Sequence, residues 1–213
     1  MIDMTVRELV VRMQRRILSA STYAGVRTVK CPLDWWVYQE ILWERRPDVV
    51  VEIGNYMGGT LLALAHQLDA IGQGRVIGVD LQHAWVAPAV RAHPRIRLVT
   101  GDATQVMGQV AAMIEPGAET LVIEDSSHEF QNTLAVLRAY EGLVQPGGYF
   151  IVEDTICWHG LDEGPFPGPM EAVSAFLKEH PEWEMDRSRE AFGLTWNPGG
   201  YLRRRGLRLE IRD

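Results

Sequence analysis

The spacing of hydrophobic positions predicts two helices near the start of the chain. Between Val6 and Leu18, apolar residues recur at helical spacing with arginines and glutamates between them, which predicts an amphipathic helix. The aromatic-rich segment Leu33–Arg45 predicts a second helix, with Pro32 at its start and Pro47 after its end. The apolar stripe of the first helix must be buried, either against its own domain or in a subunit interface.

From residue 48 onward, short and almost wholly apolar runs alternate with helical patterns. Such runs indicate strands covered on both faces, and their alternation with helices indicates βαβ units. The predicted strands are Asp48–Ile53, Arg75–Asp80, Ile96–Thr100, Thr120–Ile123 and Gly148–Glu153. The predicted helices are Thr60–Ala70, Ala84–Ala92, Gln105–Ile114 and Phe130–Gly142. We therefore predict an α/β fold with a mostly parallel sheet.

The last part of the chain begins with a stretch rich in glycine and proline, residues 160–169, in which no regular element can form. A loop of this kind between ordered segments is often functional, for example as a lid. A helix, Met170–Lys178, and strands within Trp183–Asp186 and Leu194–Arg212 follow, and we expect these strands to pair antiparallel. We predict a single domain over residues 1–213, with a helical extension, 1–46, and a core, 47–213.

Composition and charge exclude several classes of protein. The chain is 46% hydrophobic and 23% charged, as in an ordinary soluble domain, and its net charge of −7 argues against nucleic-acid or anionic-membrane partners. A basic cluster near the C-terminus alternates with Leu207, Leu209 and Ile211, which is typical of an edge strand with a solvated face. That cluster consists of Arg203, Arg204, Arg205, Arg208 and Arg212.

Two cysteines, Cys31 and Cys157, are too few for a disulfide framework. The first residues lack a continuous apolar run of signal-peptide type, and no window approaches the roughly 18 apolar residues that a membrane span needs. We expect a cytoplasmic protein.

A glycine-rich turn follows the first predicted strand. The sequence Glu52-Ile53-Gly54-Asn55-Tyr56-Met57-Gly58-Gly59-Thr60 leads directly into a helix. We expect Gly54 to turn the chain sharply, and Gly58 and Gly59 to let the backbone approach a ligand. The amide groups at the start of the helix point into the crevice where open α/β sheets bind ligands. The spacing differs from the Gly-x-Gly-x-x-Gly fingerprint of dinucleotide-binding proteins.

Acidic residues follow the first three strands in turn. Glu52 is placed to face the cationic amino group of S-adenosylmethionine (SAM), Asp80 to bind the ribose hydroxyls, and Asp102 to contact the adenine amino group. Each acid alone could simply cap a helix, but the repetition favours a nucleotide site, with SAM ahead of NAD. The predicted SAM contacts are Glu52, Gly54, Asn55, Tyr56, Gly58, Gly59, Thr60, Asp80, Leu81, Asp102, Ala103 and Asp125.

Further acids follow the fourth and fifth strands, where we expect Asp125, Glu153 and Asp154 to converge beside the SAM crevice. Crowded carboxylates repel one another, and hard oxygen ligands suit Mg²⁺, Ca²⁺ or Mn²⁺. Such an ion lowers the pKa of a bound hydroxyl, and His128 is placed to act as the general base that takes its proton. A structural interpretation stands beside this one: the acids cap the following helices, and the histidine is not catalytic.

The remaining histidines, His66, His83, His93, His159 and His180, are interpreted as surface or core residues. His159 lies nearest the proposed site and is kept as a candidate substrate contact. Trp158, Tyr56 and Phe166 are candidates for an apolar wall, although aromatic residues are as often part of a core.

From Tyr23 to Arg204 the chain resembles the cephalosporin hydroxylase / rhamnosyl O-methyltransferase family. The resemblance rests on Tyr23-Ala24-Gly25-Val26, Lys30-Cys31-Pro32-Leu33-Asp34, Tyr38-Gln39-Glu40, the segment 47–54, Gly58-Gly59-Thr60, Asp125-Ser126-Ser127-His128, Gly147-Gly148-Tyr149, Val152-Glu153-Asp154-Thr155, the segment 169–173 and the segment 197–202.

This resemblance implies a Rossmann-like class I methyltransferase fold, with a seven-stranded, mostly parallel sheet and an antiparallel C-terminal strand. It implies SAM and a divalent ion, Mg²⁺ or another, with Asp125, Glu153 and Asp154 as ligands. Related macrolide-sugar O-methyltransferases imply His128 as the base. Family members act on antibiotics and other secondary metabolites, and many form homo-oligomers. Thr60 stands where serine is expected, and the N-terminal region is shorter than in the macrolide enzymes, which favours a smaller or more exposed acceptor.

The sequence thus predicts a SAM- and metal-dependent O-methyltransferase that acts on a hydroxyl of a small-molecule natural product, a sugar or another secondary metabolite. The family name raises the possibility of an oxygenase, but such enzymes need two histidines and a carboxylate, and the only His-x-acid is His180-Pro181-Glu182, outside the predicted crevice. A non-catalytic SAM-binding partner protein and a metal-independent N-methyltransferase are two further possibilities.

Overall fold

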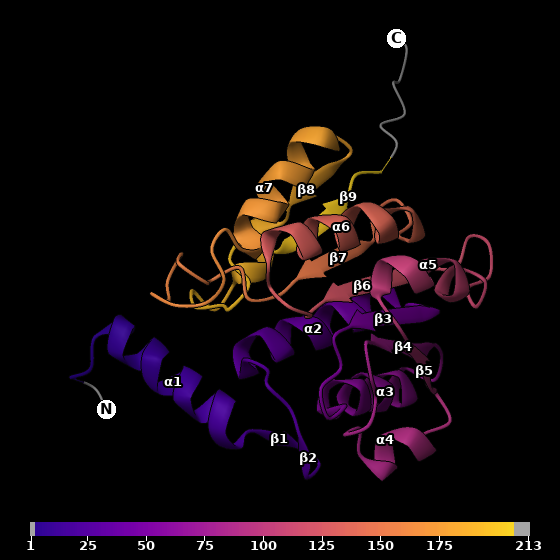
Figure 1. Cartoon of the computed structure of the whole chain (residues 1–213), viewed down its shortest axis with the longest axis horizontal. Coiled ribbons are helices and arrows are strands. Elements are labelled where there is room, and N and C mark those ends of the chain that lie inside the picture. The colour runs from indigo at the N-terminus through magenta and orange to yellow at the C-terminus, as the bar shows by residue number, and fades with distance from the viewer. Residues whose placement is uncertain (1–2, 207–213) are drawn as a thin grey trace.

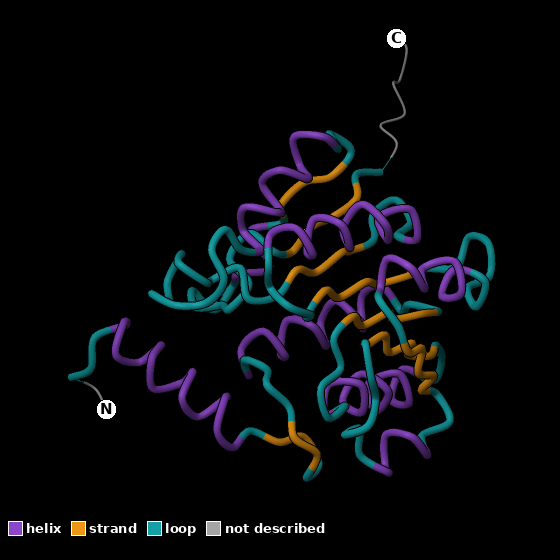
Figure 2. The backbone as a smooth tube through the Cα atoms, viewed as in Figure 1, coloured by secondary structure: helices purple, strands orange, loops and turns teal. Residues whose placement is uncertain are grey.

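A central sheet with helices on both faces forms the body of the molecule (Figures 1 and 2), in a computed structural model that describes residues 3–206. The seven strands lie in the order β5-β4-β3-β6-β7-β9-β8. Strands β3 to β7 are parallel, and β9 is antiparallel to both of its neighbours. The sheet consists of β3 (Val49–Ile53), β4 (Arg75–Asp80), β5 (Ile96–Thr100), β6 (Thr120–Glu124), β7 (Tyr149–Val152), β8 (Trp183–Met185) and β9 (Tyr201–Arg204). The predicted fold class and sheet are confirmed.

Successive residues of the buried strands point to opposite faces of the sheet and build two cores. In β3, Val50 belongs to the core under α2, α3 and α4, whereas Val49 and Val51 belong to the core under α5, α6 and α7. The helices are α2 (Pro32–Arg45), α3 (Gly59–Ile71), α4 (Pro88–Ala92), α5 (Ala103–Ala111), α6 (Phe130–Tyr140) and α7 (Pro169–Glu179), with short 3₁₀ turns at Glu141–Leu143 and Arg187–Glu190. Under these helices β3, β6 and β7 are buried along their whole length, whereas Arg97 and Thr100 of the outer strand β5 are exposed.

Helix α1 (Val6–Ala20) and a small hairpin, β1 (Thr22–Tyr23) with β2 (Val26–Arg27), lie at the periphery of the sheet (Figure 1). A capping box between Thr5 and Glu8 starts α1. Helix α1 buries Val10 and Ile17 in a third cluster with residues of the loop after β7, so its stripe packs partly on its own domain.

Two predictions about the later part of the chain are wrong. Strand β9 is not at the edge of the sheet, because β8 pairs with it on the outer side. Residues 194–200 form no strand, because the Asn197-Pro198-Gly199-Gly200 segment turns the chain before Tyr201. The predicted strand residues Leu207, Leu209 and Ile211, with Arg208 and Arg212, lie outside the described residues.

Helix α4 begins at Pro88 rather than at the predicted Ala84, since proline suits the first helical position. Cys31 and Cys157 are free thiols. Within residues 3–206, no helix combines the length and apolarity that crossing a membrane requires.

Candidate active site

The turn after β3 places two parts of the protein backbone very close together. Gly54 has φ +88°, and a Cβ at this position would overlap with the backbone carbonyl of Asp125 at the end of β6. A Cβ on Gly59 would lie 2.5 Å from the carbonyl oxygen of Arg27 in β2. The missing side chain of Gly59 thus accommodates the β2 backbone, and the predicted contact of Gly59 with a ligand stays a prediction. These glycines make room for neighbouring protein backbone, while Gly58, at φ +85°, caps α3.

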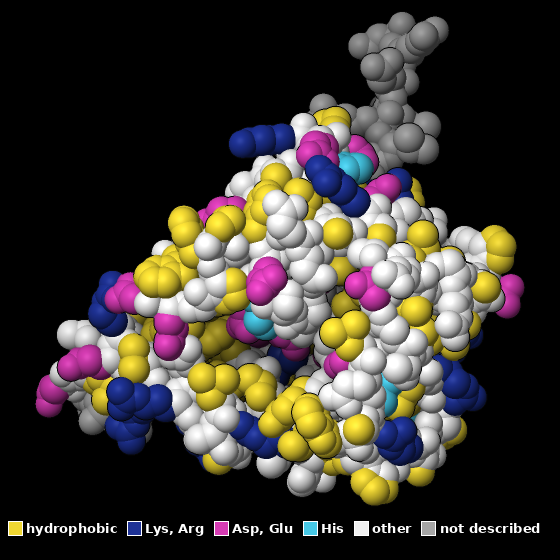
Figure 3. All heavy atoms as spheres, in the orientation of Figure 1, with side chains coloured by type: hydrophobic (Ala, Val, Ile, Leu, Met, Phe, Trp, Pro, Cys, Tyr) yellow, Lys and Arg dark blue, Asp and Glu magenta, His cyan; other side chains and the backbone are white. Residues whose placement is uncertain are grey.

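A cavity of about 510 Å³ opens at the carboxyl ends of β3, β4, β5 and β6. Its volume is in the range of small-molecule and cofactor sites. Most of the predicted SAM contacts line it, whereas Glu52 and Gly58 do not. The lining includes Gly54, Asn55, Tyr56, Gly59, Thr60, Asp80, Leu81, Asp102, Ala103 and Asp125. The space-filling view shows a hollow on this face with acidic and histidine side chains beside it (Figure 3).

The two acids at the ends of β4 and β5 also hold local structure. Asp80 accepts hydrogen bonds from the backbone N–H groups of Asn55 (2.7 Å) and Tyr56 (3.3 Å), so it braces the glycine turn from the neighbouring strand. Asp102 caps α5 through the backbone N–H of Thr104 at 2.9 Å. Both side chains therefore combine a structural role with a position on the cavity wall.

His83 is a structural residue of the site that the sequence did not single out. Its imidazole lies 3.0 Å from Asn55 Oδ1 and 2.9 Å from Thr100 Oγ1, and so joins the glycine turn to the end of β5. Burial lowers the pKa of His83 below its usual 6.5, which favours the neutral ring that such a bridge needs. A single histidine after a strand gives no sequence signal for this contact.

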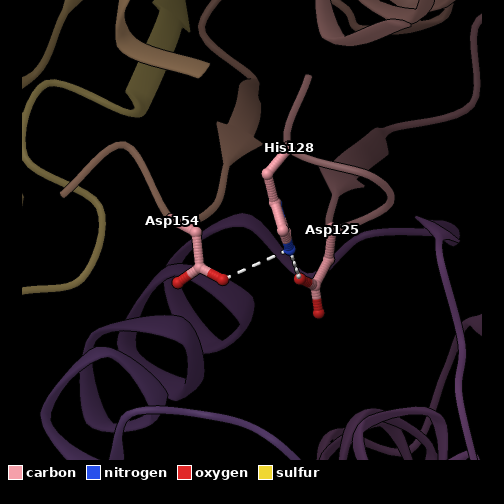
Figure 4. Close-up of side chains that lie close together, drawn as sticks. All are labelled: Asp125, His128 and Asp154. Carbon is pink, nitrogen blue, oxygen red and sulfur yellow. Dashed lines mark ion pairs between the residues drawn. The ribbon is translucent and has the colours of Figure 1, made fainter. Parts of the chain in front are cut away.

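Asp125, His128 and Asp154 converge at the mouth of the cavity (Figure 4). His128 Nε2 lies 3.3 Å from Asp154 Oδ2 and 3.8 Å from Asp125 Oδ1. His128 (φ 57°) and Asp154 (φ 55°) both have left-handed backbone conformations, which are uncommon outside glycine. The backbone N–H of Asp154 donates to Asn197 Oδ1 at 3.0 Å, so the segment before β9 helps to fix this acid.

The electrostatics of this cluster are set by burial and by the crowding of acids. Burial alone would lower the pKa of His128, but the carboxylates of Asp154 and Asp125 outweigh it and raise the pKa above 6.5. Burial raises the pKa of Asp154 above its usual 3.8, against the pull of His128. Among the described residues, the buried Nδ1 of His128 has no hydrogen-bond partner.

Glu153 belongs to a different group of acids. Its carboxylate lies with those of Glu52 and Asp125, and the Lys30 ammonium contacts all three. Asp125 is shared by both groups, whereas Glu153 and Asp154 fall into separate ones. The three carboxylates predicted to share one ion thus lie beside one another. Glu153 pairs with Lys30, however, whereas Asp154 pairs with His128. The ligand set stays a prediction. Lys30 carried no predicted role.

The donor set fits a hard divalent ion. The carboxylate oxygens of Asp125 and Asp154, which line a cavity, are the kind of ligand that Mg²⁺ or Mn²⁺ takes in proteins. The buried Glu52, which does not line the cavity, is a candidate partner for a cationic group. Both carboxylate oxygens of the buried Glu52 lack hydrogen-bond partners among the described residues, and burial raises the pKa of Glu52 to about 8.

Several residues considered from the sequence lie elsewhere. His159 pairs with Glu171 at 2.7 Å and is not part of the Asp125–His128–Asp154 cluster. Trp158 and Phe166 form an edge-to-face pair with ring centroids 6.2 Å apart and do not line the large cavity. His180 and Glu182 group with Glu141, and no candidate metal-binding group within residues 3–206 contains two histidines. The two-histidine site that an oxygenase requires is therefore not found there.

The sheet order, the antiparallel β9 between β7 and β8, and the acid-lined cavity define a Rossmann-like methyltransferase fold. A solved O-methyltransferase from Bacillus cereus with SAH supports this fold, with a TM-score of 0.58, 18% identity, and 84% of this chain and 80% of that chain covered.

Residues 15–205 match the family model described as Rhamnosyl O-methyltransferase/CmcI. A rhamnosyl O-methyltransferase of Mycobacterium tuberculosis is 34% identical over 194 residues, which are 87% of this chain and 79% of the relative. A solved CmcI structure with Mg and SAM has 25% identity and a TM-score of 0.70, covering 90% of this chain and 84% of that one. The chain belongs to the rhamnosyl O-methyltransferase/CmcI family, as the resemblance predicted.

Proposed function

We propose that this chain is a SAM- and divalent-metal-dependent O-methyltransferase that methylates a hydroxyl of a small-molecule natural product. The observation that carries the proposal is the convergence of Asp125, His128 and Asp154 at the mouth of the cavity (Figure 4). The relatives named for O-methylation of rhamnosyl groups and the CmcI structure with Mg and SAM support it.

When bound, SAM supplies a methyl group on a sulfonium, and a divalent ion lowers the pKa of an acceptor hydroxyl. Asp125 and Asp154 would hold the ion, with Glu153 as the third predicted ligand. SAM would donate its methyl group to the acceptor oxygen and would leave as S-adenosylhomocysteine. The acceptor proton goes to His128 Nε2, the nitrogen that faces the two aspartates.

The raised pKa of His128 has a consequence for this role. With the Asp154 and Asp125 carboxylates unshielded, the ring holds its proton at neutral pH more readily than a free histidine does. Positive charge held by the same two aspartates reduces that stabilisation and favours the neutral ring, which is the form that accepts a proton. His128 and the ligands are therefore coupled through shared carboxylates.

The lining of a second cavity, beside Asp154, favours a small acceptor that has an apolar part. A second cavity of about 80 Å³ shares Asp154 with the large one and is lined by Ile17 and Leu18 of α1 and by Leu161 of the loop after β7. This loop contains the predicted lid, residues 160–169, and Arg7 of α1 forms an ion pair with Asp162 in it. A sugar carrying an apolar group would place its hydroxyl at Asp154 and its apolar part between helix and loop.

The test is a methyl-transfer assay with purified protein, SAM, Mg²⁺ and a panel of rhamnosylated and other hydroxylated natural products. Mass spectrometry should detect an acceptor that gains one methyl group together with S-adenosylhomocysteine. EDTA should abolish the transfer and Mg²⁺ should restore it. Transfer that survives EDTA points to a metal-independent methyltransferase, and SAM binding without transfer to any acceptor points to a binding protein.

We also propose that the protein is a homo-oligomer. Val6 and Leu18 on α1 are 70% and 57% exposed, although Val10 and Ile17 of the same helix are buried on the same chain. A second copy packed on α1 would cover them. Light scattering coupled to size exclusion should give a mass above that of one chain, and a monomer mass at micromolar concentration contradicts the proposal.

A further inference from the structure

Lys30 lies just before α2 and reaches into the group of acids at the ends of three strands. Its side chain is 5% exposed. The ammonium donates to Asp125 Oδ2 at 2.8 Å, contacts Glu153 Oε1, and lies 3.8 Å from Glu52 Oε1. One basic side chain thus binds acids that belong to the ends of β3, β6 and β7.

The same carboxylates form a cage that would suit a cation. The oxygens of Glu52, Asp125 and Glu153 lie within 4.8 Å of one another, which is close enough for one ion to bind all of them. The Lys30 ammonium lies among these oxygens. Asp125 and Glu153 are also predicted ligands of the divalent metal, so the ammonium and the metal require the same carboxylates.

Lysine is rare in this chain, because only Lys30 and Lys178 among its 21 lysines and arginines are lysines. An ammonium is a compact point charge with three donors, so it can serve several carboxylates around one point, which a planar guanidinium does less well. Burying such a charge is costly unless it is paired. Lys30 meets that condition through the three acids and lies 5.9 Å from the Tyr38 ring centroid.

We propose that Lys30 is an internal counter-ion that competes with the divalent metal for Asp125 and Glu153. This inference rests on the metal site of the proposed function. The ammonium holds the two carboxylates together when the metal is absent, and metal binding separates it from them. Since the two cations repel each other across a few ångströms of partly buried space, the lysine weakens metal binding while it stabilises the fold.

The first test compares Lys30→Met with Lys178→Met, which changes the exposed second lysine. Titration calorimetry would measure Mg²⁺ and Mn²⁺ affinity, and thermal unfolding would be recorded in EDTA and in saturating Mg²⁺. We expect Lys30→Met to bind Mg²⁺ at least about tenfold more tightly than the wild type, because the like-charge repulsion is gone. Its Tm in EDTA should fall, and its gain in Tm on adding Mg²⁺ should exceed that of the wild type and of Lys178→Met. Equal or weaker Mg²⁺ binding by Lys30→Met overturns the proposal.

A second test needs no change to Lys30. Protein labelled with ¹³C at the lysine ε carbon should give two side-chain signals, which Lys178→Met assigns. Titration of the wild type with Mg²⁺ should shift the Lys30 signal and leave that of Lys178 in place. A Lys30 signal that does not move while calorimetry shows saturation refutes the competition.

The two proposals can fail separately. If neither the wild type nor Lys30→Met binds Mg²⁺, the competition is refuted, whereas O-methylation is judged by the transfer assay alone. If Lys30→Met binds Mg²⁺ and the wild type does so only weakly, the competition is supported whether or not an acceptor has been found.

Discussion

Replacing Gly54 with alanine tests how closely the glycine turn and the predicted metal ligand depend on each other. The added Cβ would overlap with the Asp125 carbonyl and lie 2.6 Å from its carbon and 2.8 Å from Ser126 Cα. These are backbone atoms at the end of β6, so no side-chain rotation can relieve the contact. The strand end must move, and Asp125 moves with it.

Gly72 provides a matched control for the conformational part of this cost. It has φ +89°, against +88° at Gly54, and a Cβ there would meet no atom within 4 Å. Gly72→Ala should therefore cost only the left-handed penalty of roughly 1–2 kcal/mol. Gly54→Ala should add an overpacking cost of about 1–3 kcal/mol to the same penalty. For a chain of this size, each 1 kcal/mol lowers Tm by roughly 2–4 °C.

The assay is urea unfolding of both variants, followed by Mg²⁺ titration and methyl transfer under conditions where both are folded. Gly54→Ala should unfold at a lower urea concentration than Gly72→Ala. A displacement of Asp125 by about 1 Å should reduce the kcat/KM of Gly54→Ala by roughly 10²-fold. Gly72→Ala should keep wild-type activity. If Gly54→Ala and Gly72→Ala were equally stable and equally active, the end of β6 would accommodate the added Cβ without displacing Asp125, and the predicted dependence of Asp125 on Gly54 would be refuted.

Three further predictions concern single side chains. His128→Asn, in which asparagine tolerates the positive φ of this position, should lower kcat by roughly 10²–10⁴-fold and leave the SAM Kd unchanged; a wild-type kcat excludes the base role. Burial raises the pKa of Glu52 to about 8, so the ionised form that attracts the SAM amino group increases as pH rises toward that value. SAM affinity should therefore improve by up to about tenfold per pH unit between roughly pH 6 and 7.5, and Glu52→Gln should flatten the profile; an equal slope in both proteins argues against this contact. Asp34→Ala should lower the free energy of unfolding by roughly 2–4 kcal/mol in urea melts, because it leaves the buried donors Trp196 N and Tyr201 OH, at 2.8 and 2.9 Å, without an acceptor; a loss below about 1 kcal/mol contradicts it.

The sheet was predictable because its central strands β3, β6 and β7 are buried along their whole length. The runs at Arg75–Asp80 and Ile96–Thr100 were placed with the bounds that the structure has. The β1–β2 hairpin was missed because strands of two residues are too short to show a period. The position of β9 was misjudged because its arginines suggested solvent, whereas Arg203 pairs with Glu184 on β8.

The sequence predicted only those features of the site that follow from the positions of strand ends. Asp125 and Asp154 follow adjacent parallel strands, so their proximity follows from the topology. The partners that orient them come from distant parts of the chain. Lys30 is 95 residues from Asp125, and Asn197 is 43 residues from Asp154. Nothing in the local pattern around Lys30 or Asn197 indicates which acid each one meets.

Backbone strain at the site explains why these distant contacts matter. Tyr56, His128, Asp154 and Trp158 are non-glycine residues with positive φ, and each lies on or beside the two cavities. Such conformations cost roughly 1–3 kcal/mol each and persist only where surrounding contacts fix them. For Asp154, one such contact is Asn197, which in turn binds Tyr38 OH at 2.9 Å. Asp34 holds the flanking Trp196 in the same buried network. Through Asn197 and Trp196, Tyr38 and Asp34 of α2 thus help to orient Asp154. Helix α2 therefore helps to position the acids of the site as well as covering the sheet.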